Sequence, residues 1–362
     1  VFIGGPRQVG KTTFSRHLGK IFAREKNEDV AYLNWDVVRD RRLLMAGELP
    51  SKQSVFIFDE IHKYAKWRNL VKGFFDSSAQ KRSFLVTGSA KLDYDRKGGD
   101  SLQGRYRYFR LHPYSVNELG LKTRKDLEAL LKFGGFPEPL HKQDEAEWRL
   151  WQRDRIERVV YDDIRDLESV KEISLIDELS HLLVSRVASP LSLRSLQEDL
   201  QVAHASVERW LSILERLYYC YRIPPFGAPR VRAVKKEQKL YLWDWSSCES
   251  HGQKFENLVA SQLLKYCHFV EDTEGFRMEL RFLRDIDKRE VDFVVIKEKK
   301  PLFAVECKTG EKSVSPAMRY FKQRTSIPQF YQVHLGDRDY QDKETGIRVL
   351  PFLKFCKELN LP

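Results

Sequence analysis

The chain has 362 residues, of which 42% are hydrophobic and 32% charged, with a formal net charge of +11. This length exceeds one ordinary hydrophobic core, so we expect a soluble globular protein of several domains. No apolar run reaches the ~18 residues of a membrane helix, and the five scattered cysteines contain no C-x-x-C pair. These facts exclude a membrane-spanning protein, a disulfide framework and a cysteine-based zinc site, and they predict a cytoplasmic location without a membrane partner.

The first motif is a phosphate-binding P-loop. An apolar run at 1–4 predicts a core strand, so we expect native residues before Val1, and apolar spacing over 14–22 predicts a helix. Between them the chain reads Gly5, Pro6, Arg7, Gln8, Val9, Gly10, Lys11, Thr12, Thr13. Glycines let backbone N–H groups surround a phosphate, the lysine reaches the β- and γ-phosphates, and the Thr12 hydroxyl binds Mg²⁺.

A second apolar strand, at 55–58, ends in two carboxylates. We predict that Asp59 holds Mg²⁺ through water and that Glu60 orients or deprotonates the attacking water. His62 follows on the loop, where we expect a surface residue. The P-loop and this strand together predict an ATP hydrolase.

Two further segments complete the N-terminal pattern. The strand at 83–86 ends in Thr87, Gly88 and Ser89, and residues 101–107 precede a strand at 108–111. Phosphoryl transfer is promoted by an arginine from a neighbouring subunit, and Arg105 is the candidate; a plain surface arginine is the alternative.

These motifs resemble the bacterial and archaeal AAA+-type ATP-binding proteins that end in a restriction-endonuclease-like domain. The resemblance rests on the motifs at 5–13, 58–62, 85–90, 101–105, 111–115 and 134–139. It implies ATP binding and a polar sensor of the γ-phosphate at Thr87 or Ser89. It also implies an α/β fold with an AAA+-type core at 1–119, a helical lid at 120–168, a winged helix at 169–244 and a nuclease-like domain at 245–362.

The prediction of DNA binding rests mainly on the middle of the chain. Glycines and proline at 134–137 interrupt the expected lid helices, and helices near 173–187, 193–200 and 205–214 with strands at 218–223 and 239–243 predict the winged helix. Its expected wing holds six basic residues: Arg222, Arg230, Arg232, Lys235, Lys236 and Lys239. Residues 1–120 add 22 basic against 13 acidic side chains. We therefore expect DNA as a partner, with a spacer or protein-docking module as the alternative.

The tail resembles the PD-(D/E)XK nuclease core. Asp292 lies on one apolar strand and Glu306 and Lys308 on the next, and Glu256 lies on a preceding helix. Carboxylates on adjacent strands can bind Mg²⁺ or Mn²⁺, and the lysine offers a positive charge to the nucleophile. Asp285 and Glu290 are expected to be solvated loop charges.

The sequence therefore predicts a Mg²⁺-dependent ATPase that binds DNA and whose ATP state is coupled to a deoxyribonuclease-like tail. One alternative is an ATP-gated protein-interaction switch with a catalytically silent tail. Another is a homo-oligomeric motor that remodels DNA, which requires the arginine in trans.

Overall fold

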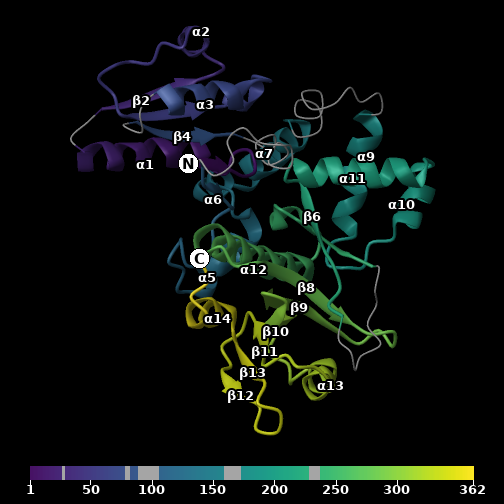
Figure 1. Ribbon diagram of the computed structural model, residues 1–362. Helices are drawn as coiled ribbons and strands as arrows, with labels where there is room; N and C mark the ends of the chain where they lie inside the picture. The colour runs from purple at the N-terminus through teal and green to yellow at the C-terminus, as the bar shows by residue number, and fades with distance from the viewer. Residues whose placement is uncertain (27–28, 78–81, 89–105, 159–172, 228–236) are drawn as a thin grey trace. The chain divides into compact units, whose positions relative to one another are not determined.

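The computed structural model describes residues 1–26, 29–77, 82–88, 106–158, 173–227 and 237–362. They form two compact units, whose elements are labelled in Figure 1. The first comprises Val1–His112 and Arg216–Tyr218, and the second comprises Pro113–Glu215 and Tyr219–Pro362. Each unit has a hydrophobic cluster of its own.

The first unit is built on a parallel sheet of five strands in the order β2-β3-β4-β1-β5. The strands are β1 (Phe2–Gly4), β2 (Val30–Asn34), β3 (Val55–Asp59), β4 (Ser83–Thr87) and β5 (Tyr108–Arg110), and the helices are α1 (Lys11–Lys26), α2 (Val38–Ala46), α3 (Trp67–Ser77) and the short η1 (Ile61–Lys63). Because parallel strands end at the same edge of a sheet, the residues that follow β1, β3 and β4 are brought together.

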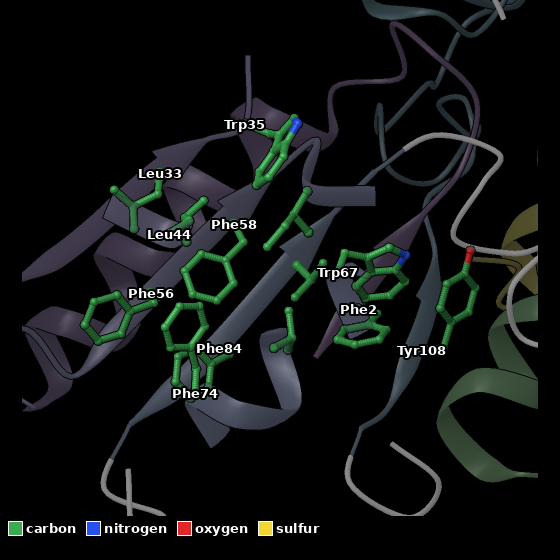
Figure 2. Close-up of a cluster of buried hydrophobic side chains, with 13 residues drawn as sticks. Phe2, Leu33, Trp35, Leu44, Phe56, Phe58, Trp67, Phe74, Phe84 and Tyr108 are labelled. Atoms are coloured by element: carbon green, nitrogen blue, oxygen red, sulfur yellow. The ribbon is translucent and has the colours of Figure 1, made fainter. Parts of the chain in front are cut away.

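Helices cover both faces of this sheet. On one face Ile3, Ile57 and Leu85 pack with Leu18 of α1. On the other face aromatic side chains of the strands pack against α3, as Figure 2 shows for Phe56, Phe58, Phe74 and Phe84. The alternation of Phe56, Ile57 and Phe58 between the faces is the period of a strand buried on both sides. The expected α/β core is therefore present in this unit.

The second unit begins with three helices, α5 (Arg124–Phe133), α6 (Pro137–Lys142) and α7 (Glu145–Glu157). The glycine pair between α5 and α6 has a packing reason. A Cβ on Gly135 would lie 2.4 Å from the ring of the fully buried Trp245, and Gly134, at φ 78°, would bring one within 2.6 Å of Asp244 Oδ1. The glycine turn thus has a structural role, while the lid function of these helices stays a prediction.

Three helices and a hairpin follow. The helices are α9 (Ile173–Ser185), α10 (Leu193–Leu200) and α11 (His204–Arg216), and the hairpin pairs β6 (Cys220–Ile223) with β7 (Lys239–Leu242). The elements match those expected for a winged helix, and that interpretation stays a prediction. Within the second unit, the backbone after β6 hydrogen-bonds to Phe282 of the C-terminal sheet. Asn257 of helix α12 (His251–Glu274) bonds both backbone groups of Leu242. The hairpin is therefore built into the C-terminal part of the chain.

The C-terminal part is a mixed sheet of six strands in the order β12-β13-β11-β10-β9-β8. Its elements are η4 (Trp245–Ser247), α12 (His251–Glu274), β8 (Met278–Arg284), β9 (Glu290–Lys297), β10 (Lys300–Lys308), α13 (Pro316–Arg324), β11 (Gln329–His334), β12 (Tyr340–Gln341), β13 (Arg348–Pro351) and α14 (Phe352–Glu358). The strands β9 and β10 form the expected hairpin, whose turn residues Glu298 and Lys299 both have positive φ.

Candidate nucleotide site and buried carboxylate cluster

The P-loop joins the end of β1 to the start of α1. Gly5 (φ 146°) and Gly10 (φ 96°) have backbone angles that side chains disfavour, and a Cβ on Gly5 would lie 2.3 Å from the carbonyl oxygen of Leu111. Gln8 also has a positive φ of 62°. A loop with this conformation that leads directly into a helix N-terminus presents backbone N–H groups to an anion. The sequence motif therefore has the backbone geometry that phosphate binding requires.

Lys11 is the first residue of α1 and is buried against the loop. Its Nζ donates to the carbonyl oxygens of Gly5, at 2.9 Å, and of Pro6, at 2.6 Å. The loop backbone thus holds the ammonium beside the turn that would receive a phosphate. The phosphate-binding role that the motif predicts for Lys11 stays a prediction.

Asp59, at the end of β3, is the centre of the site. Its carboxylate is 3% exposed and accepts hydrogen bonds from Thr12, at 2.8 Å, from Tyr32, at 2.6 Å, and from Thr87. Thr87 meets Asp59 because the two residues are register partners at the ends of β3 and β4. The sequence predicted Thr12, Asp59 and Thr87, and the structure brings these three together.

Tyr32 was missed by the sequence analysis. It lies on β2, which pairs with β3, and the guanidinium of Arg16 lies 3.8 Å from the centre of its ring. Burial and the hydrogen bond to Asp59 raise the pKa of the Tyr32 phenol, so it stays protonated and donates. The signal that could have found it is a tyrosine two residues before the end of a strand in the same sheet.

Glu60 follows Asp59 in a left-handed conformation, with φ 57°, and begins the turn η1. Its side chain is 25% exposed, and burial raises its pKa although the nearby Lys11 opposes the rise. His62 lies 3.5 Å from Glu60 and is buried, so the expectation of a surface residue is wrong. The left-handed conformation of Glu60 turns the chain directly after β3, and His62 then lies inside the protein.

Ser89 and Arg105, which were also predicted as site residues, lie outside the described residues.

Two of the three acidic residues predicted for the metal site of the tail, Glu256 and Asp292, lie around one buried ammonium group. Lys239 Nζ lies 2.9 Å from Glu256, 2.6 Å from Glu290 and 3.5 Å from Asp292. The Lys239 side chain is fully buried. Glu306 is bonded instead to Lys308, at 2.6 Å. We call Glu256, Glu290, Asp292 and Glu306 the carboxylate cluster.

Burial acts strongly on the carboxylate cluster. It raises the pKa of Glu256 to about 7 and that of Glu306 to about 8, and the charge of Asp292 adds to both shifts. Burial by itself would lower the pKa of Lys239, yet the carboxylates around it raise the pKa overall. Lys239 is therefore charged at every ordinary pH.

Two expectations about this region are wrong. Asp285 and Glu290 were expected to be solvated loop charges. Asp285 is instead buried and pairs with Arg289, and Glu290 begins β9 and bonds both Lys239 and Arg284. Lys239 was counted in a basic wing, yet it lies inside the protein. Arg222 was counted there too, and it is 11% exposed and bonded to Glu208 and Glu215. The other four basic residues of that run lie outside the described residues.

Within the described ranges, no group of three or more His, Cys, Asp and Glu residues is arranged to hold a metal ion. The predicted metal site of Glu256, Asp292 and Glu306 therefore has its residues close together but stays a prediction. Across the same ranges, no helix is long and apolar enough to cross a membrane.

Comparison with known proteins adds the following. A family described as AAA domain matches residues 1–120, and two domains of unknown function, DUF8612 and DUF4143, match residues 124–251 and 251–355. The uncharacterized protein MJ1544 of Methanocaldococcus jannaschii is 24% identical over 399 residues, which cover 98% of this chain and 87% of that protein. The uncharacterized protein Rv2008c of Mycobacterium tuberculosis is 23% identical over 249 residues, which cover 67% of this chain and 54% of that protein.

The match to the AAA domain covers the P-loop and the residues around Asp59. The two domains of unknown function leave the winged-helix and nuclease-like interpretations as predictions. The N-terminal part of this chain, from residue 1 to residue 120, therefore matches the AAA domain family.

Proposed function

We propose that this protein hydrolyses ATP with Mg²⁺ in its AAA-type domain and that the nucleotide state controls what its second unit binds. The observation that carries the proposal is the convergence of Thr12 and Thr87 on Asp59 beside the P-loop. A hydroxyl and a carboxylate are hard oxygen donors, and Mg²⁺ is typically held by such a pair together with substrate phosphates. The residues present therefore fit the ion.

Each residue has a role in this proposal. Lys11 and the loop backbone bind the β- and γ-phosphates, and Thr12 and Asp59 hold Mg²⁺, which neutralises the charge that develops on the phosphates. Glu60 accepts a proton from the attacking water, and its raised pKa brings its basicity closer to the operating pH. Thr87 or Ser89 acts as the polar sensor of the γ-phosphate.

ATP turnover and nucleotide binding, measured separately, test this proposal. Lys11→Ala should weaken binding of a fluorescent ATP analogue, whereas Glu60→Gln should retain binding and lose at least about 100-fold in turnover, the usual range for a missing general base. Lys20→Ala and Glu25→Gln are matched controls, because both residues are exposed on α1. Full turnover in Glu60→Gln would contradict the assigned role, and equal rates with GTP would contradict ATP specificity.

DNA binding by the second unit is part of the proposal. Its support is the net charge of +11, but most of that charge lies in residues 1–120, and Arg222 and Lys239 face other parts of the protein and add nothing to an exposed basic surface. If the second unit contacts DNA phosphates, its affinity for DNA should fall steeply with salt. DNA should also stimulate ATP turnover. If neither occurs, the alternative of an ATP-gated protein-interaction switch is favoured.

Arg105 is proposed as an arginine supplied in trans. A trans arginine makes the specific activity rise with protein concentration, and Arg105→Ala should then remove that rise. A protein that remains a monomer at every concentration would contradict both this role and the oligomeric motor.

A further inference from the structure

Lys239 is the feature of the second unit that the proposed ATPase leaves unexplained. Its side chain is fully buried, and its ammonium lies within 3.5 Å of three different carboxylates. Lysine is rarely buried in this way unless it is paired with acids. The burial of Lys239 therefore depends on the acids around it.

The fold holds Lys239 firmly in this position. It is the first residue of β7, and its backbone pairs with Ile223 of β6. Tyr241, two residues later, donates to the same oxygen of Glu256 that accepts from Lys239. Asn257 then fixes β7 to α12 through both backbone groups of Leu242. The ammonium is thus placed by backbone pairing as well as by its charge.

The carboxylate oxygens nearest Lys239 are already bonded. Glu256 Oε1 accepts from Lys239 and Tyr241, and Glu290 bonds Lys239 through one oxygen and Arg284 through the other. Asp292 faces Lys239 with Oδ1, while its Oδ2 accepts from a backbone N–H on β10. A divalent ion would need these oxygens at about 2.0–2.2 Å and would lie next to a positive charge that cannot leave.

We propose that the ammonium of Lys239 is the permanent cation of the carboxylate cluster and takes the place of a divalent metal ion. It does for Glu256, Glu290 and Asp292 what a metal does in a catalytic cluster, since it neutralises their charges and holds them together. It offers no coordination site for water, so it supplies no metal-bound nucleophile. The C-terminal sheet then lacks the metal ion on which a metal-dependent nuclease relies.

The strongest rival is a metal ion at Glu306. Its Oε2 is buried and lacks a hydrogen-bond partner among the described residues, while Oε1 bonds Lys308. An ion bound there would depend on Glu306 and Asp292 and would be present in the unaltered protein. The two possibilities therefore make opposite predictions about the wild-type chain.

The test measures Mn²⁺ binding by the full chain in an Asp59→Asn background without nucleotide, so that the ATP site does not contribute. With Lys239 intact, Asp292→Asn and Glu306→Gln should leave Mn²⁺ binding unchanged. Lys239→Met keeps much of the side-chain volume and removes the charge. It should tighten Mn²⁺ binding at least about tenfold, because repulsion by the ammonium is lost, and the added Asp292→Asn should abolish the gain.

Thermal unfolding gives a second measurement. Lys239→Met should unfold at a lower temperature in EDTA and recover in Mn²⁺, whereas Lys132→Met, which removes a surface ion pair with Glu145, should not respond to Mn²⁺. Wild-type binding that is lost with Glu306→Gln would overturn the proposal, and so would a folded Lys239→Met protein that gains no Mn²⁺. If Lys239→Met does not fold, the wild-type measurement decides the question. A failed ATPase assay would leave this result unaffected, since Asp59 is already replaced.

Discussion

We expect that the charge of Arg222 stabilises the folded protein and does not contact DNA, and this can be tested by mutation. Its guanidinium forms two hydrogen bonds with Glu215, at 2.8 and 2.9 Å, and two with Glu208, at 3.0 and 3.1 Å. The Arg222 side chain is 11% exposed, that of Glu215 is 28% exposed and that of Glu208 is 43% exposed. Hydrogen bonding to these two acids raises the pKa of Arg222 further, so it is charged at every ordinary pH.

The expected cost of Arg222→Met follows from this exposure. Breaking a buried ion pair by removing one partner costs about 3–5 kcal/mol. Here Glu208 reaches water and contributes little, so we expect a loss of about 2 kcal/mol in the free energy of unfolding. For a unit of this size that corresponds to a melting temperature lower by roughly 4–8 °C. Arg194→Met, which removes an exposed ion pair with Glu198 on α10, is the matched control and should change the melting temperature little.

A double-mutant cycle and a DNA titration check the reasoning. Arg222→Met and Glu215→Gln should be less than additive, because each removes the same interaction. Arg222→Met should leave the salt dependence of DNA binding unchanged. If the slope falls by about one unit, as expected for a lost phosphate contact, or if the melting temperature matches that of Arg194→Met, then the internal role of Arg222 is refuted.

Three further predictions concern buried polar groups. Tyr32→Phe removes one of the three hydroxyls on Asp59, so turnover should fall roughly tenfold at low Mg²⁺; unchanged Mg²⁺ dependence would contradict this. Because burial raises the pKa of Glu60, turnover should fall on acidification at a higher pH than an ordinary glutamate allows, and a rate that stays flat down to about pH 5 would exclude Glu60 as the base. The pKa of Glu306 is raised from 4.5 to about 8, so its folded form keeps a proton that the unfolded chain releases. Its contribution to stability is complete below pH 4.5 and is lost as the pH rises to about 8. Glu306→Gln, which is always neutral, should flatten that decline in melting temperature, and an unchanged decline would contradict the assignment.

The residues of the candidate nucleotide site could be predicted from the sequence. The P-loop is a run of consecutive residues whose glycines and lysine define the local backbone, and the structure has positive φ at Gly5 and Gly10 as the motif requires. Asp59 and Thr87 could also be predicted, because an apolar strand that ends in a polar residue delivers it to one edge of a parallel sheet. Tyr32 could not, since its role depends on β2 lying next to β3.

Which charges are internal depends on tertiary packing. Lysine and arginine are usually exposed, so Lys239 and Arg222 were counted as a basic surface. The pairing of β6 with β7 and the packing of β7 on α12 bring Lys239 beside Glu256 and Glu290, which are far apart in sequence. When the acids that neutralise a lysine lie far from it in the sequence, no local sequence pattern indicates that the lysine is buried. The sequence therefore predicted a phosphate-binding loop, and the packing places Glu256, Glu290 and Asp292 around a lysine.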